Sequence, residues 1–377
     1  MKIPFNKPFL TGNETKYIEQ AVQSMKISGD GIFTKKCHAF FEEKYGFQKC
    51  LLTTSCTDAL EMAAILINTE PGDEVIMPSY TFVSTANAFV LRGAKIVFAD
   101  SLPNHPNIDV SKIEPLITPK TKAIVPVHYG GVACDMDEIM SLAKKYNLFV
   151  IEDAAQAIDS FYNDKPLGGI GHLAAFSFHE TKNIISGEGG MLVINDDQFS
   201  ERAEIIREKG TNRSQFYRGE VDKYGWMDIG SSFLPSDIIA AFLFAQLENI
   251  EHIQKKRISH WNTFYNKLKH LANQNHFSIL ECDENKTNNG HLFAIVLNDL
   301  DTRSKLIAHM REKSILAVFH YLSLHKSRFY ADKHDGRDLE NCDKFSDTLM
   351  RLPFYYDLTP EEIDLICDEI IAFFNGK

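Results

Sequence analysis

The sequence predicts an α/β fold with a mostly parallel sheet, followed by a smaller α+β region. Three observations carry this prediction. Short apolar runs alternate with helical stretches from about residue 49, which is the order of a βαβ series. These runs are continuously apolar, as expected for strands that helices cover on both faces. Near residue 245 the pattern changes to long helical stretches with few strands between them.

The individual elements follow from the same patterns in chain order. Strands are expected at 49–54, 73–79, 95–100, 122–129 and 148–153, and the helices between them at 58–67, 85–93 and 136–147. Two more strands follow at 173–179 and 191–194. The pattern at 236–272 predicts one long helix or two helices end to end, and after it come strands at 291–298 and 315–321 and helices at 303–313 and 360–374. We therefore expect a large domain over 1–245 and a small C-terminal domain over 246–377.

The composition excludes several classes of protein. A chain of 377 residues is too long for one compact core. Its net charge of -11 argues against bulk binding of nucleic acid, although a small anion could still bind in a locally positive pocket. The seven cysteines are scattered without a CxxC or metal spacing, which favours reduced thiols in the cytoplasm and no metal site. The sequence has neither an apolar signal core at its start nor an apolar run of about 18 residues, so we expect no membrane association.

The ends of three expected strands carry candidate functional residues. Ser55, Cys56 and Thr57 lie where a strand turns into a helix, and the free N–H groups of such a turn bind phosphate well. Taken alone, an ordinary helix N-cap is the commoner explanation. Asp153 ends an apolar strand, where a carboxylate is costly unless it meets a cation or donors, or caps the next helix. Lys182 lies between two apolar strands; a single loop lysine is usually just exposed, but its amine can also form an imine with a carbonyl.

The three strand ends together favour pyridoxal phosphate as a cofactor. This cofactor needs a lysine for its aldehyde, a carboxylate for its ring nitrogen and a cup for its phosphate. All three kinds of group occur at strand ends within one βαβ region. The glycines at 187, 189 and 190 are then expected to leave room for the cofactor and to form tight turns.

The motifs around these residues resemble a known family. EDAAQ (152–156), FSFHETKN (176–183) and GEGG (187–190) look like the DegT/DnrJ/EryC1 sugar aminotransferases, and the resemblance covers essentially the whole chain. Longer stretches, 78–100, 127–140 and 203–219, are most similar to the members that form dTDP-4-amino-4,6-dideoxygalactose, with the viosamine-forming members as near relatives. The resemblance implies an aspartate-aminotransferase-type fold (PLP fold type I) for the large domain and pyridoxal 5'-phosphate as the cofactor.

The resemblance also implies roles for single residues. Lys182 would be the catalytic Schiff-base lysine, Asp153 would pair with the pyridinium nitrogen, and Gln156 would hydrogen-bond near the phenolic oxygen of the ring. Phe82 would stack on the ring, although a phenylalanine after a strand is more often a core residue. The phosphate would be held by Cys56, Thr57 and Ser177.

One position departs from the family pattern. Many members supply an asparagine from the neighbouring subunit to the cofactor phosphate. Leu234 stands at that place in this sequence and cannot donate a hydrogen bond, so Ser231 or Ser232 would have to substitute. The departure concerns this one contact and leaves the expected homodimer, with its active site at the subunit interface, unchanged.

The implied reaction moves an amino group from L-glutamate to C4 of dTDP-4-keto-6-deoxy-D-glucose for surface polysaccharide synthesis. The gluco product, dTDP-4-amino-4,6-dideoxy-D-glucose, is favoured slightly over its galacto epimer. Lys182 would move the protons in both half-reactions. The dTDP-sugar would be bound by a charge-rich loop and by a strand end in the small domain: Asn212, Arg213, His320 and Tyr321.

Three rival functions are weighed against this one. A keto-sugar dehydratase on the same scaffold would carry a histidine in place of Lys182. A non-enzymatic regulator on this fold would not need Lys182, Asp153 and Gln156 together, and would be colourless when purified. A nicotinamide oxidoreductase would need GxGxxG after the first strand, where this chain has TTSCTD (53–58).

Overall fold

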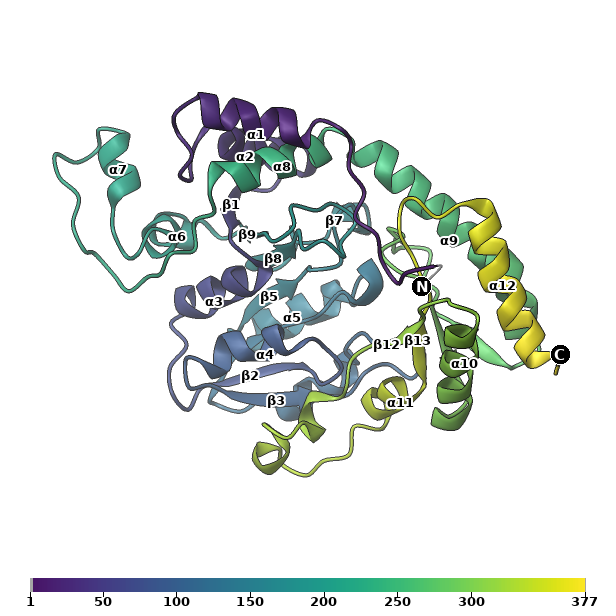
Figure 1. The fold of residues 1–377 in the computed structure, drawn as a ribbon. Coiled ribbons are helices and arrows are strands. Elements are labelled where there is room, and N and C mark those ends of the chain that lie inside the picture. Colours follow the sequence, from purple (N-terminus) through teal and green to yellow (C-terminus); the bar gives the residue numbers. More distant parts are fainter. Residues whose placement is uncertain (1–2, 377) are drawn as a thin grey trace.

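The main sheet has seven strands and forms the centre of the molecule (Figure 1). The structure is a computed structural model and describes residues 3–376. The strands are β1 (Lys49–Thr53), β2 (Glu74–Pro78), β3 (Lys95–Ala99), β4 (Thr121–Ile124), β5 (Phe149–Asp153), β8 (Leu173–Ser177) and β9 (Gly190–Ile194), in the spatial order β1-β9-β8-β5-β4-β2-β3. Only β9 runs antiparallel to its neighbours, β8 and β1, so the predicted mostly parallel sheet is confirmed.

Helices cover both faces of this sheet, which explains why its strands are continuously apolar. All five residues of β2 and of β9 are buried. One core cluster contains side chains of α1 (Glu14–Gln23), α2 (Ile32–Tyr45), α5 (Met136–Tyr146) and α8 (Asp237–Leu247). A second contains side chains of α3 (Cys56–Leu66), α4 (Val83–Val90) and α6 (Ser200–Arg207). Figure 1 shows α1, α2 and α8 packed together on one side of the sheet.

A second, antiparallel sheet lies in the C-terminal part of the chain. Its order is β10 (Phe277–Ile279), β11 (Ala294–Leu297), β13 (Leu349–Arg351) and β12 (Val318–Phe319). It is accompanied by α9 (Ile250–Asn273), α10 (Leu300–Glu312), α11 (Glu340–Thr348) and α12 (Pro360–Phe374). The pattern at 236–272 becomes two helices end to end, α8 and α9. Ile3 is fully buried in the core of this region, and the division into two domains at residue 245 stays a prediction.

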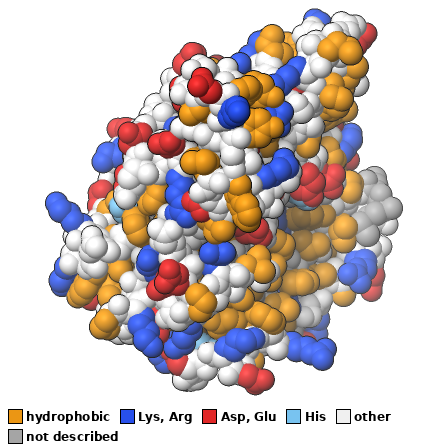
Figure 2. All heavy atoms as spheres, turned by 90° about the vertical axis from the view of Figure 1, so that its left-hand side faces the viewer, with side chains coloured by type: hydrophobic (Ala, Val, Ile, Leu, Met, Phe, Trp, Pro, Cys, Tyr) orange, Lys and Arg blue, Asp and Glu red, His pale blue; other side chains and the backbone are white. Residues whose placement is uncertain are grey.

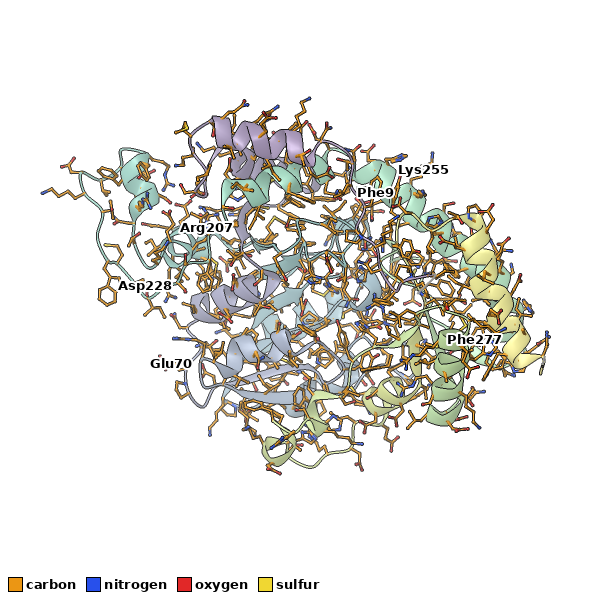
Figure 3. All side chains as sticks on the ribbon, viewed as in Figure 1. Phe9, Glu70, Arg207, Asp228, Lys255 and Phe277 are labelled. Atoms are coloured by element: carbon orange, nitrogen blue, oxygen red, sulfur yellow. The ribbon has the colours of Figure 1, made fainter. Side chains whose placement is uncertain are left out.

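A long arm, residues 209–232, leaves the body after α6 and carries the short helix α7 (Arg213–Tyr217) (Figure 1). Isolated bridges between Glu208 and Ser232 and between Thr211 and Trp226 close its base. Gly210 has φ of 76°, and a β-carbon there would lie 1.8 Å from the Asp228 carbonyl oxygen, so only glycine fits this crossing. In Figure 3, Arg207 and Asp228 mark the place where the arm meets the body.

The remaining elements are short. They are the hairpin β6 (Phe161–Tyr162) and β7 (Lys165–Pro166) and the 3-10 turns Val110–Lys112, Glu114–Leu116, Tyr129–Gly131, Asp197–Phe199, Leu324–Lys326 and Ala331–Lys333. No helix among residues 3–376 is both long and apolar enough to cross a membrane.

Candidate active site

The carboxyl ends of the parallel strands open into one large cavity between the main sheet and the second sheet. Its volume is about 1080 Å³. Because carboxyl ends of parallel strands share one edge, residues that follow β1, β2, β5 and β8 meet here. Most of the predicted site residues line it: Cys56, Thr57, Phe82, Asp153, Gln156, Ser177, Lys182, His320 and Tyr321. Asn212 and Arg213 do not line it.

Lys182 lies in the turn that follows β8. Its backbone N–H donates to the carbonyl oxygen of His179 at 2.9 Å, which fixes the start of the turn. Burial lowers the pKa of Lys182 from 10.5 to about 8. A lysine with this pKa is neutral in about one molecule in ten at pH 7, far more often than an ordinary lysine, and the neutral amine is the form that acts as nucleophile or base.

The glycines after Lys182 make room for protein backbone. Gly187 has φ of 81° and forms the turn that returns the chain to β9. Gly190 is the first residue of β9, and a β-carbon there would lie 2.3 Å from the carbonyl carbon of Ser55. Because Gly190 has no side chain, the backbone of β9 can approach the turn between β1 and α3 closely. At Gly189 a β-carbon would meet the Ser186 hydroxyl oxygen at 2.3 Å. The expected room for a cofactor is used, at these two positions, for close approach of the chain to itself.

Asp153 is buried at the end of β5. Its Oδ2 accepts from the Thr85 hydroxyl at 2.7 Å, and its Oδ1 accepts from the Ala155 N–H at 3.2 Å. Burial raises the pKa of Asp153, and these two donors and the charge of Lys182 oppose the rise. Asp153 forms no ion pair within the part of the chain that the structure describes. A protonated ring nitrogen would supply the cation that this carboxylate lacks, so the site fits a pyridinium cofactor.

The N-terminus of α3, where the sequence predicts a phosphate cup, lies at one corner of the cavity. The Ser55 hydroxyl caps the helix by accepting from the Asp58 N–H at 3.0 Å. The Thr57 hydroxyl lies 2.8 Å from the hydroxyl of Ser84, at the start of α4. Two helix N-termini thus present hydroxyls and N–H groups to one corner of the cavity. Ser84 was not predicted, and its signal, a serine at the start of a helix, is too common to stand out.

Gln156 and Phe82 both lie near Tyr321. The Gln156 amide oxygen accepts from the Gly130 N–H at 2.7 Å, and its amide nitrogen donates to the Tyr321 hydroxyl at 3.0 Å. The Phe82 ring is 6.1 Å from that of Tyr321, and the Phe82 side chain is 55% exposed. An exposed aromatic ring that lines a cavity suits stacking on a flat ligand better than a role in the core.

His320 is tied into the protein through both ring nitrogens. Nδ1 lies 2.7 Å from the Tyr129 hydroxyl, and Nε2 accepts from the Arg351 guanidinium at 3.1 Å. Because arginine can only donate, Nε2 carries no proton. Burial holds the pKa of His320 well below its ordinary value, which agrees with a neutral ring. His320 therefore lines the cavity with its hydrogen-bonding capacity already used.

Sequence reasoning missed several residues of the cavity. Arg351, at the end of β13, and His291 both line it. Asn183 follows Lys182 in the chain, and its amide oxygen lies 2.9 Å from Nδ1 of His291. Thr85 holds Asp153, as described above. Within residues 3–376, no group of three or more His, Cys, Asp or Glu side chains is placed to bind a metal.

The predicted residues of the arm lie away from the cavity of their own chain. The Asn212 amide oxygen accepts from the Gly225 N–H at 2.9 Å and so holds the arm together. The Arg213 guanidinium donates to the Tyr217 hydroxyl at 2.9 Å. Leu234 is half-buried and packs against Gly29, where a β-carbon would lie 2.3 Å from its Cγ. Ser231 and Ser232 are exposed.

Comparison with known proteins gives one consistent family. The model of the DegT/DnrJ/EryC1/StrS aminotransferase family matches residues 8–371. GDP-perosamine synthase of Caulobacter vibrioides is 37% identical over 275 residues, which cover 72% of this chain and 72% of that protein. GDP-perosamine synthase of Escherichia coli O157:H7 is 32% identical over 380 residues, which cover 100% and 99%. Spore coat polysaccharide biosynthesis protein SpsC of Bacillus subtilis is 29% identical, with coverage of 99% and 97%.

The solved structures agree in fold. Helicobacter pylori PseC, an aminotransferase involved in the biosynthesis of pseudoaminic acid, has a TM-score of 0.92 at 25% identity, with 100% of both chains covered. DesV of S. venezuelae has a TM-score of 0.89 at 26% identity, with 98% of this chain and 97% of that one covered. The likeness extends over both sheets, so the predicted aspartate-aminotransferase-type fold is confirmed.

Proposed function

This chain belongs to the DegT/DnrJ/EryC1/StrS aminotransferase family and is a PLP-dependent sugar aminotransferase, and from that premise we propose its substrates. We propose that it moves an amino group from L-glutamate to C4 of dTDP-4-keto-6-deoxy-D-glucose. The observation that carries the proposal is the meeting of Lys182, Asp153 and the α3 N-terminus in one cavity, beside the stretches 78–100 and 127–140 that resemble C4-aminating members. The keto-sugar dehydratase is disfavoured because Lys182 is present.

The chain's own residues would divide the work of proton transfer and binding. When bound, pyridoxal phosphate supplies an electron sink for the carbon that loses or gains a proton. Asp153 would hold the ring nitrogen protonated. Lys182, with its pKa lowered by burial, would take a proton from the amino donor and return one to the sugar carbon. Thr57, Ser84 and Ser177 would hold the phosphate, and Phe82 would stack on the ring face.

The nucleotide and the C4 configuration are the finer parts of the proposal. We favour dTDP, and the product dTDP-4-amino-4,6-dideoxy-D-glucose over its galacto epimer. The similarity to two GDP-perosamine synthases makes a GDP-linked keto sugar the second candidate. SpsC, a spore coat polysaccharide biosynthesis protein, supports a role in making a surface polysaccharide such as O-antigen. We place the enzyme in the cytoplasm.

The proposal includes a homodimer with the active site at the subunit interface. The arm, residues 209–232, carries large exposed side chains: Tyr217 is 63% exposed, Trp226 85% and Met227 61%. Figure 2, which faces the side of the molecule that carries α7, shows hydrophobic side chains gathered around a hollow. Apolar surface on this scale favours a protein partner. The arm would carry Asn212 and Arg213 to the cavity of the second copy.

A product analysis tests the reaction. Purified enzyme would be incubated with L-glutamate and either the dTDP- or the GDP-linked 4-keto-6-deoxy sugar, and transfer followed by cofactor absorbance. We expect turnover with the dTDP-sugar and little with the GDP-sugar. In the NMR spectrum of the product, large couplings between H3, H4 and H5 would identify the gluco epimer, and small ones the galacto epimer. Turnover with the GDP-sugar alone would reject the dTDP part of the proposal.

A further inference from the structure

His291 lines the cavity just before β11 of the second sheet, with one ring nitrogen that has no partner. Its backbone is fixed by Arg257, whose guanidinium donates to the carbonyl oxygens of Gly290 and His291 at 2.9 and 2.8 Å. Nδ1 of the His291 ring lies 2.9 Å from the Asn183 amide oxygen. Nε2 forms no hydrogen bond in the described part of the chain, and it is not among the atoms that protein fully encloses there. This nitrogen therefore faces the cavity.

The amides around His291 determine which ring nitrogen carries the proton. Nδ2 of Asn183 donates to the Asn289 carbonyl oxygen at 2.9 Å and to the Gln254 amide oxygen at 2.8 Å. Because a backbone carbonyl can only accept, this end of the Asn183 amide is its NH2 group, and its oxygen faces His291. That oxygen also only accepts, so Nδ1 donates and carries the proton. Burial holds the pKa of His291 well below its ordinary value, which agrees with a neutral ring whose Nε2 is a bare acceptor.

Lys182 offers the complementary group on the same cavity wall. Its amine lines the cavity and forms neither a hydrogen bond nor an ion pair within residues 3–376. Asn183, which orients the His291 ring, is the next residue in the chain. Burial is the main cause of the lowered pKa of His291, and the charge of Lys182 is the next, ahead of the charges of Arg351 and Arg257. A buried amine without an acceptor is costly, so a donor and an acceptor that both lack partners are expected to meet.

We propose that Nε2 of His291 accepts a hydrogen bond from the Lys182 amine when that amine is not bonded to the cofactor. His291 is then a positioning residue, because it acts through Lys182 and not on the substrate. The inference deepens the proposed function and rests on the role of Lys182 as the base in both half-reactions. A neutral acceptor suits this role: it holds the amine in place after a proton has been taken up, whereas a carboxylate would raise the pKa of the amine more and retain the proton.

A spectroscopic measurement tests the contact without turnover. The full chain, isotope-labelled at the histidine ring nitrogens, would be loaded with pyridoxamine phosphate, which leaves Lys182 unbonded to the cofactor. We expect the NMR spectrum to show Nδ1 of His291 protonated and Nε2 bare. In Lys182→Ala the Nε2 resonance should shift downfield, because the acceptor loses its donor; His291→Gln identifies the resonance by removing it. A protonated Nε2 in the wild type, or an unchanged resonance in Lys182→Ala, would overturn the assignment.

Kinetics distinguish a contact with Lys182 from a contact with a hydroxyl of the sugar. For His291→Leu we expect the L-glutamate and the keto-sugar half-reactions to slow alike, by about ten- to a hundredfold, the scale of one hydrogen bond to a charged group. The half-saturating substrate concentrations should stay within about twofold of the wild type. His291→Gln should recover part of the rate because its amide oxygen is again an acceptor. A slower keto-sugar half-reaction alone, with a raised half-saturating concentration, would overturn the proposal in favour of the sugar hydroxyl.

His105→Leu is the matched control for the loss of a buried neutral histidine. Burial lowers the pKa of His105 to about 3, and its Nε2 also has no partner in the described part of the chain, but His105 does not line the cavity. This variant should keep both rates, and slowing equal to that of His291→Leu would overturn the positioning role. Cofactor trapped by borohydride at a lysine other than Lys182 would instead reject the base named in the proposed function, whatever the NMR spectrum shows of His291.

Discussion

The Gln156 amide donates to the Tyr321 hydroxyl at 3.0 Å, although 165 positions separate the two residues in the chain. Gln156 follows β5 of the main sheet, and Tyr321 follows β12 of the second sheet, so this bond joins both sheets across the cavity. Tyr321 has φ of 55°, a left-handed conformation that costs a bulky residue about 1–3 kcal/mol. The surrounding structure holds this strained residue in place, as expected where a precise side-chain position is needed.

Lys182→Ala is expected to abolish amino transfer while leaving the fold intact. The variant removes the amine that we propose bonds the cofactor and moves protons, whereas the cavity wall keeps its other contacts. Borohydride treatment followed by mass spectrometry should find the cofactor attached to Lys182 in the wild type and no attachment in the variant. Full transaminase activity in the variant would show that another group is the base.

The amine of Lys182 should titrate near pH 8 in cofactor-free protein. Burial favours the neutral form, so the folded-state pKa lies below 10.5, at about 8, and the reactive amine accumulates as pH rises through that value. Labelling with an amine-directed reagent, read at this residue by mass spectrometry across pH 6–11, gives the midpoint. A midpoint near 10.5 would contradict the lowered pKa, and exposed lysines on the same protein serve as the internal reference.

Much of the fold could be predicted from the sequence. Strands such as β2 and β5 were found because helices on both faces make them continuously apolar. The antiparallel β9 could not be told from a parallel strand, since its pattern, GMLVI (190–194), is equally apolar. β13 has only three residues, Leu349–Arg351, too few for any periodicity. α2 was missed although Phe33, Cys37 and Phe41 recur at helical spacing on its buried face.

The sequence predicts those residues of the candidate site that lie within short recognisable motifs. Asp153 ends β5 and Lys182 lies in the turn after β8, both within recognisable motifs, and the structure brings them into one cavity. Thr85 and Arg351 were missed because their roles depend on contacts with residues that lie far away in the chain, which no local pattern records. One signal was available for Arg351: it is a charged residue inside the apolar run LMRLPFYY (349–356).

Thr85→Val is expected to weaken catalysis through Asp153. The Thr85 hydroxyl donates to Oδ2 of Asp153 at 2.7 Å and opposes the rise in pKa that burial causes. Without this donor the pKa of Asp153 should rise further, so the acid limb of the pH–rate profile should move to higher pH. Thr81→Val is the control, because the Thr81 hydroxyl contacts Thr85 at 2.8 Å and not the carboxylate.

Asp153→Asn should slow proton transfer by about 10²–10⁴; an unchanged single-turnover rate would remove Asp153 from the mechanism.

Trp226→Glu is expected to dissociate the proposed homodimer. Trp226 is 85% exposed on the arm, and a charge there would oppose burial against a second copy. Sedimentation at micromolar concentration should show a dimer for the wild type and a shift toward the monomer of 42.8 kDa for the variant. Leu300→Glu, at the first residue of α10, where the side chain is 46% exposed, should leave the dimer intact. A wild type that is monomeric and active would reject the dimer.

Arg213→Ala is expected to raise the Michaelis constant for the dTDP-sugar by about tenfold or more. The net charge of -11 repels a nucleotide diphosphate at long range, so local cations must attract it at the cavity. Losing one charge-assisted contact costs roughly 1.5–3 kcal/mol, and about 1.4 kcal/mol is a factor of ten. The glutamate half-reaction should change much less, because it requires no nucleotide. An equal loss in both half-reactions would show that Arg213 serves the fold or the shared site.

A mixed dimer distinguishes two possibilities: that Arg213 acts in the active site of its own chain, and that the arm carries it to the active site of the partner subunit. The Arg213 guanidinium bonds Tyr217 on the arm and does not line the cavity of its own chain, so we expect it to act in the partner's site. A dimer of one Lys182→Ala subunit and one Arg213→Ala subunit has a single site with an intact lysine. If Arg213 acts across the interface, that site receives the intact arginine of the other subunit, and its Michaelis constant for the dTDP-sugar is that of the wild type. If Arg213 acts within its own chain, the same site lacks the arginine, and the constant rises as in the Arg213→Ala homodimer. The raised value in the mixed dimer would therefore contradict the interface assignment while leaving nucleotide binding by Arg213 in place.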